Sequence, residues 1–125
     1  TVFDTFPWPQ KPSAAEVTGV AKAAKNLRKL RESLMSKSDL ALRDLYRTLD
    51  LPGENPLKEA HDKLDAAVRK AYKISKSADW RQSLLKLNYE IAEQETHLKK
   101  VVGPGLPPVI KDAGKFIGTD CVQLS

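Results

Sequence analysis

The chain has 125 residues, of which 41% are hydrophobic and 30% are charged, and its formal net charge is +5. This length fits one domain with its own core, and the composition fits a globular protein in solution. No apolar run approaches the ~18 residues of a membrane span, and no signal-peptide pattern opens the chain, so we expect no membrane partner. The single cysteine favours a reducing cytoplasm as the setting.

The positive charge is concentrated in one segment. Residues 11–37 hold seven basic and two acidic residues, whereas the remainder of the chain has 14 of each. A localised excess of positive charge points to a polyanionic partner more strongly than a diffuse excess would.

Residues that support metal, redox or nucleophilic chemistry are scarce. Cys121 is the only cysteine, and His61 and His97 are the only histidines. A single cysteine forms no internal disulfide, and two distant histidines supply too few ligands for a metal centre. Phosphate-loop, dinucleotide-binding, zinc-protease and nucleophile-elbow motifs are absent, so we expect no catalytic, cofactor or metal residues in this chain. A pair of Cys121 with a histidine remains a minor alternative.

Residues 1–12 form the first predicted unit, an extended arm. Its aromatic side chains include Phe6 and Trp8, and the interleaved prolines disfavour helix before Ser13. We expect Phe6 and Trp8 to fold back onto the body of the protein.

The first predicted helix begins at Ser13 and ends near residues 34–36. Ser13 and Glu16 have the spacing of a capping box. Gly19 costs such a helix about 1 kcal/mol relative to Ala, so we expect a close packing contact there.

Three lysines of this helix form the strongest candidate binding surface. Lys22, Lys25 and Lys29 fall on the side opposite the apolar face, at spacings that make one ridge of ammonium groups. Phosphates accept such cations without requiring base-specific geometry. A solvated lysine face is the alternative, and the absence of interleaved aromatics argues against base stacking.

Two more helices follow. The second is expected after a cap at Ser36 or Ser38, with Asp39 in its first turn, and it ends before the Pro-Gly turn at 52–53. The third begins with Asn55 as N-cap and Pro56 at the first helical position, and ends near residues 72–73.

The fourth predicted helix begins at Ser77 or Asp79 and ends near residues 99–100. Its apolar residues form two stripes, and the second contains Leu85, Tyr89 and Ala92, so this helix needs two covering surfaces. Residues 101–125 follow as an irregular tail. We therefore predict an all-α fold, a four-helix and mostly antiparallel bundle over residues 13–100.

His61 and the nearby carboxylates have structural interpretations. We expect His61 to be half-buried, with its ring bonded to a backbone carbonyl or to a neighbouring helix. Asp62 and Asp65 have the spacing for acid–base work, but surface pairing with Lys58 and Arg69 is the favoured interpretation.

Arg31 falls in the apolar sector of the first helix. A guanidinium at such a position is expected to reach a carboxylate on a neighbouring helix, either Asp65 or Asp44.

Four short motifs occur in a familiar order: FDTFPWP at 3–9, LRDLY at 42–46, AHDKLDAAVRKAY at 60–72 and LLKLN at 84–88. Together they resemble the C-terminal helical region of adenine-N6 DNA methyltransferases of the type IIG/MmeI-like restriction-modification group. The resemblance covers about residues 3–100. The residues that carry it include Phe6, Pro7, Trp8, Pro9, His61, Asp65 and Tyr72.

The resemblance implies a place in a larger protein. The upstream parts would be a methyltransferase domain, which uses S-adenosylmethionine and flips the target adenine, and a target recognition domain. The catalytic N-P-P-Y loop of that family is absent here, so this chain alone is expected to be non-catalytic and without cofactor. Its expected partners are double-stranded DNA and the two upstream domains. The sequence departs from the family at Lys73, where a Gly often ends the helix.

The sequence thus predicts a non-catalytic helical domain that supports a target recognition domain and contacts the DNA backbone. The alternative is a helical protein-interaction or dimerisation module without DNA binding, supported by the second stripe of the fourth helix and the aromatic arm.

Overall fold

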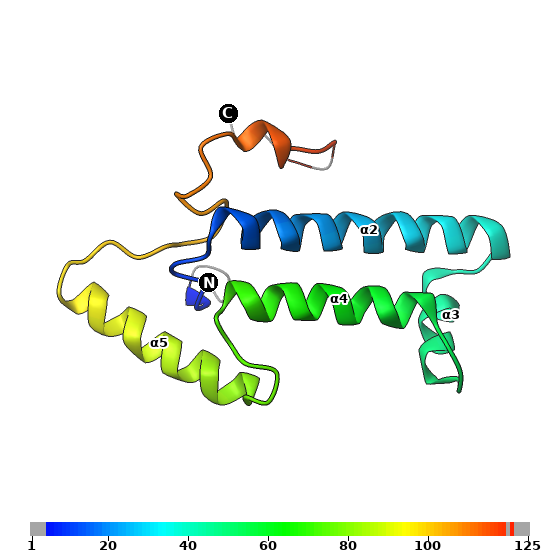
Figure 1. Ribbon diagram of the computed structural model, residues 1–125, viewed down its shortest axis with the longest axis horizontal. Helices are drawn as coiled ribbons and strands as arrows, with labels where there is room; N and C mark the ends of the chain where they lie inside the picture. Colours follow the sequence, from blue (N-terminus) through cyan, green and yellow to red (C-terminus); the bar gives the residue numbers. More distant parts are fainter. Residues whose placement is uncertain (1–4, 120, 122–125) are drawn as a thin grey trace.

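The computed structural model describes residues 5–119 and residue 121, and it is all-α over these residues. Figure 1 shows the arrangement of the helices and the path of the chain between them. No strand occurs in the described part of the chain. The described residues include four α-helices, α2 (Ala14–Ser38), α3 (Leu42–Arg47), α4 (Pro56–Ala71) and α5 (Trp80–Thr96), and two short 3-10 helices, η1 (Thr48–Asp50) and η2 (Ala113–Lys115).

Helix α2 begins as the sequence predicts. The Ser13 hydroxyl accepts a hydrogen bond from the Glu16 amide at 3.1 Å, and the Glu16 carboxylate accepts one from the Ser13 amide at 3.4 Å. The helix is longer than expected and ends at Ser38, where Asp39 adopts a left-handed conformation with φ 49°. Short polar Asp tolerates this conformation better than most residues.

The predicted start of α3 is wrong. Its N-cap is Ala41, which makes no side-chain capping bond, and not Ser36 or Ser38. Asp39 is occupied in closing α2, so the chain needs two further residues before helical geometry resumes.

Helix α4 has the predicted cap. The Asn55 side chain accepts hydrogen bonds from the amides of Leu57 and Lys58 at 3.0 and 3.3 Å, and Pro56 occupies the first turn. The helix ends in a Schellman arrangement, in which the Ile74 amide donates to the Arg69 carbonyl at 2.9 Å. Lys73 takes the left-handed position at φ 59°, where Gly is the usual residue.

Helices α2 and α4 lie side by side and run in opposite directions (Figure 1). Their contact, closed at one end by α3, forms the core cluster of Leu27, Leu45 and Leu57. Leu57 has no exposed surface. The packing of the first predicted helix on the third is therefore established.

Helix α5 diverges from this pair in Figure 1 and contains no fully buried residue. Asp79 caps its start, in agreement with one of the two predicted caps, by accepting from the Arg81 and Gln82 amides. Its end is Thr96, earlier than the predicted lysines, because Leu98 adopts a left-handed conformation at φ 55°.

The N-terminal arm is tied to the end of α4 and to the segment after α5. The Tyr72 hydroxyl donates to the Pro7 carbonyl at 2.9 Å, and the Gln10 side chain exchanges two hydrogen bonds with the backbone of Val102, at 2.8 and 3.0 Å. Trp8 is half-buried, whereas Phe6 is 40% exposed, so the predicted return of both side chains onto the body of the protein stays a prediction. Thr5 is helical, so the arm is not extended throughout. Phe3, a further aromatic of the arm, lies outside the described residues.

Candidate nucleic-acid interface

The lysine ridge (Lys22, Lys25 and Lys29) projects from α2, and all three side chains are exposed. Within the described residues, none of the three makes an ion pair. The Glu32 carboxylate of the same helix pairs with Arg28 at 3.1 Å and not with a lysine of the ridge. The ammonium groups of the ridge are therefore not neutralised by their own helix.

The C-terminal tail reaches the ridge at one position. The Lys25 ammonium donates to the Lys115 carbonyl of η2 at 3.4 Å, and Figure 1 shows the tail passing alongside α2. This exposed and long hydrogen bond holds Lys25 weakly. Lys22 and Lys29 make no such contact among the described residues.

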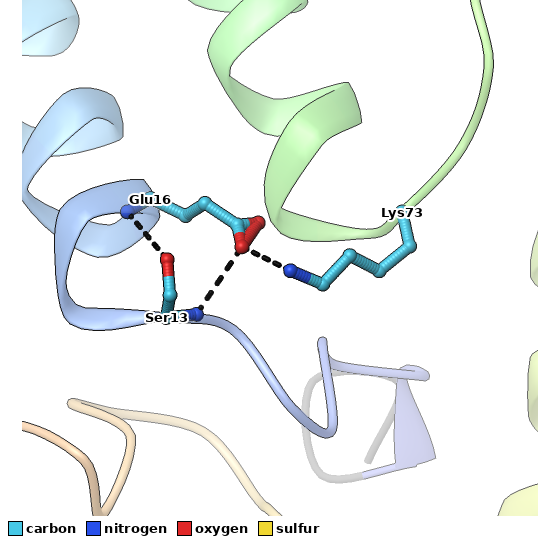
Figure 2. Close-up of polar contacts among 3 residues, drawn as sticks. All are labelled: Ser13, Glu16 and Lys73. Atoms are coloured by element: carbon cyan, nitrogen blue, oxygen red, sulfur yellow. Dashed lines mark hydrogen bonds and ion pairs between the residues drawn. The ribbon is translucent and has the colours of Figure 1, made fainter.

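A polar contact joins the start of α2, the helix that carries the ridge, to the end of α4 (Figure 2). Figure 2 shows the Glu16 carboxylate between the Lys73 ammonium and the backbone amide of Ser13. The bond from Lys73, followed by those from Ser13, lowers the pKa of Glu16. Lys73 reaches this carboxylate because its left-handed backbone turns the chain at the end of α4.

The seam between α2 and α4 opens into two adjoining hollows, of ≈ 420 and ≈ 430 Å³, which share Gly19, Lys63 and Ala67. We call them together the interhelix groove. Its further lining includes Lys22 on the α2 side and Lys70 on the α4 side. Lys63 and Lys70 are not indicated by the sequence pattern, since they come near Lys22 only when the two helices pack.

The expectation of a close contact at Gly19 is wrong. A Cβ built on Gly19 meets no atom within 4 Å, and the residue faces the interhelix groove instead of a packed neighbour.

His61 has the structural role predicted for it. Its Nε2 is hydrogen-bonded to the Tyr46 hydroxyl at 2.9 Å, and the two rings meet edge to face with centroids 5.4 Å apart. His61 is half-buried, and its bond joins α4 to α3. It does not face the lysine ridge or the groove, so it supports the fold.

The ion pair predicted between Asp65 and Arg69 does not form. Asp65 is exposed, while the Arg69 guanidinium donates to the carbonyls of Ser75 and Ala78 at 2.6 and 3.2 Å. The same group lies 4.7 Å from the ring centroid of Trp80. Arg69 therefore joins the end of α4 to the start of α5. Asp62, the other carboxylate, is exposed and makes no ion pair with Lys58 in the described part of the chain.

The predicted partners of Arg31 are also wrong. Arg31 is half-buried, but among residues 5–119 and 121 it has no ion pair with Asp44 or Asp65. Asp44 instead pairs with Arg47 of its own helix at 3.4 Å.

Tyr72 is the centre of a small aromatic contact at the arm. Its ring meets Trp80 edge to face at 5.8 Å, its hydroxyl holds Pro7, and burial raises its pKa. The arm adds a tilted contact of Phe6 and Trp8, whose centroids are 5.2 Å apart, and Pro9 is half-buried beside them. These motif residues hold the arm against the helices.

The described residues contain no cluster of three or more His, Cys, Asp or Glu side chains that could hold a metal ion. Cys121 is exposed and accepts a bond from the Gly118 amide at 3.2 Å. No helix in the described ranges is long and apolar enough to cross a bilayer.

No family model matches this chain, and comparison with curated proteins and with solved structures found no significant match.

Proposed function

We propose that this chain is a non-catalytic helical domain of a DNA adenine methyltransferase or restriction-modification enzyme, and that it contacts the phosphate backbone of double-stranded DNA. The observation that supports this most directly is the lysine ridge, whose three exposed ammonium groups carry no ion pair in the described residues. Cations that lack acidic neighbours attract phosphates at long range and release counterions on binding. The methyl donor S-adenosylmethionine belongs to the parent enzyme in this proposal.

The remainder of the proposal concerns the upstream target recognition domain. Leu85 and Tyr89 of α5 are 54% and 68% exposed, and together they form an apolar surface without a cover in the described residues. An uncovered surface of this kind fits a neighbouring domain. In this account the mostly antiparallel four-helix bundle is completed when that domain holds α5 against α2 and α4.

The test of DNA contact is the salt dependence of binding. The affinity of the 125-residue chain for a double-stranded oligonucleotide is measured by fluorescence anisotropy over a series of salt concentrations. Three neutralised phosphates predict a slope of log K against log salt of about −3. Replacing Lys22, Lys25 and Lys29 by Glu should remove most of this slope.

A matched control separates the ridge from net charge. The variant Lys76→Glu, Lys99→Glu, Lys100→Glu changes the charge by the same amount at exposed positions outside α2. We expect it to retain most of the slope. Equal loss in the two variants, or a wild-type chain with no salt-dependent binding, would overturn the proposed DNA contact.

A protein-interaction module is the second candidate, favoured by the same exposed surface of α5. This function predicts a concentration-dependent mass in sedimentation equilibrium. The variant Leu85→Gln, Tyr89→Gln should then abolish the association, and salt-dependent DNA binding should be absent. A monomeric wild-type chain at all accessible concentrations would contradict self-association.

A further inference from the structure

The interhelix groove carries lysines from both of its walls. Lys63 and Lys70 are exposed on α4, and the hollows that they line also include Lys22 of the ridge. We propose that Lys63 and Lys70 complete a two-helix phosphate-binding surface with Lys22. This inference rests on the proposed DNA contact and adds residues that the ridge alone does not contain.

The spacing along the two helices fits an extended polyanion. Lys63 and Lys70 are seven residues apart, as are Lys22 and Lys29, which places each pair about 10 Å apart along its helix. Helices α2 and α4 are antiparallel neighbours (Figure 1), and the hollow lined by Lys22 and Lys63 adjoins the one lined by Lys63 and Lys70, so these three lysines follow the seam between the helices. A duplex backbone, with its regular charges, can engage two such rows at once.

The acidic residues of the groove do not pair with its lysines in the described residues, so the ammonium groups can bind an anion. Lys22, Lys63 and Lys70 make no ion pair within the described ranges, while the Glu16 carboxylate is already paired with Lys73. Glu59 is the remaining acidic residue of the lining. The groove therefore presents a net positive surface to an incoming ligand.

Small side chains form part of the lining of the groove. Gly19, Ala23, Ala60 and Ala67 lie between the lysine walls, and space for a Cβ remains at Gly19. No aromatic residue lines either hollow, so base stacking has no platform there. The lysines of the surface can receive the sugar–phosphate backbone.

The C-terminal tail contacts the ridge on the side away from the groove. Lys25, on the far side of the ridge from the groove, is held by the Lys115 carbonyl, whereas Lys22 on the groove side is not. We therefore expect the backbone to approach from the groove side, where Lys22 makes no hydrogen bond to the tail in the described residues.

The test compares two neutral double variants of the full chain in the same salt series. Lys63→Gln, Lys70→Gln should reduce the slope of log K against log salt by about 1.8, which corresponds to two phosphate contacts. Lys58→Gln, Lys76→Gln removes the same charge from exposed positions that do not line the groove and should change the slope little. Circular dichroism of both variants establishes that the helices persist.

The possible outcomes separate this inference from the proposed function. An unchanged slope in Lys63→Gln, Lys70→Gln, together with loss in the ridge variant, overturns the two-helix surface and leaves the DNA contact standing. Absence of wild-type DNA binding overturns both. Equal displacement of the DNA by polyglutamate, at matched charge concentration, would show an acidic polypeptide as the preferred ligand and would also overturn the inference.

Discussion

At the scale of the residue, Gly19 has an unfavourable helix propensity that no packing contact explains. Gly in a helix interior is unfavourable by about 1 kcal/mol relative to Ala, and no neighbour in the structure requires its small size. We predict that Gly19→Ala raises the free energy of unfolding by about 0.5–1 kcal/mol in urea denaturation.

The control is Gly53→Ala, at a turn where φ is 109°. A Cβ is strained in that conformation, so this variant should lower stability. A destabilising Gly19→Ala would show that α2 needs the glycine for a reason that the packing does not reveal.

A second residue-scale prediction concerns Glu16 and pH. Its pKa in the folded protein lies below the ordinary value of 4.5, first because of Lys73 and then because of Ser13. The ionised carboxylate therefore stabilises the fold above that pH, and its contribution is lost as the pH falls through the lowered pKa. The stability difference between wild type and Glu16→Gln should shrink from about pH 6 to about pH 3.

Urea midpoints across this range measure the effect. Glu54→Gln, at an exposed position, controls for the loss of one negative charge. A difference between wild type and Glu16→Gln that stays constant with pH would contradict the role given to the Lys73 contact.

The sequence predicts the role of a residue whose partners lie a few positions away along the chain. Ser13 and Asn55 cap their helices because their partners lie two or three residues away. The partners of Arg31 and Arg69 could not be predicted in this way, because they depend on which elements face each guanidinium in the folded protein. Arg69 meets carbonyls six and nine residues away, which helical spacing does not indicate.

At the scale of the element, Arg69 is the link that holds the start of α5. Two hydrogen bonds to carbonyls and the contact with Trp80 converge on one guanidinium. Hydrogen bonds of charged groups contribute about 1.5–3 kcal/mol, and the lower end applies to this half-buried site. We predict that Arg69→Ala accelerates amide hydrogen exchange in α5 by about tenfold and leaves the α2/α4 core unchanged.

Arg69→Lys is the matched variant for this prediction. Lys keeps the charge but lacks the planar fork that reaches two carbonyls and stacks on an indole, so we expect an intermediate effect. Equal exchange rates in wild type and Arg69→Ala would show that α5 is held by other contacts.

Helix boundaries were predicted well where a side chain caps the helix and poorly where the backbone ends it. Asp39, Lys73 and Leu98 all adopt left-handed conformations, and two of them displaced predicted boundaries, the start of α3 and the end of α5. Lys73 and Leu98 are residue types that rarely adopt this conformation, so the sequence does not indicate it at these positions.

At the scale of the whole molecule, the sequence predicted the all-α class and the structure added the arrangement. Periodicity identified the apolar face of each helix, and the core between α2 and α4 follows from it. The divergence of α5 could not be predicted, since periodicity indicates that a face needs cover without indicating what covers it. The lysine ridge was predicted from spacing on one helix, but Lys63 and Lys70 entered the candidate site only through packing.

The proposed contact of the positive surface of α2 with DNA is tested most directly by lysine acetylation. The extent of acetylation at each lysine is measured by mass spectrometry with and without a DNA duplex. The account predicts that DNA slows the modification of Lys22 and Lys29 several-fold. Lys86 and Lys99, in α5 and just after it, should react at unchanged rates. Uniform protection of all lysines, or protection that is confined to the α5 region, would contradict the account.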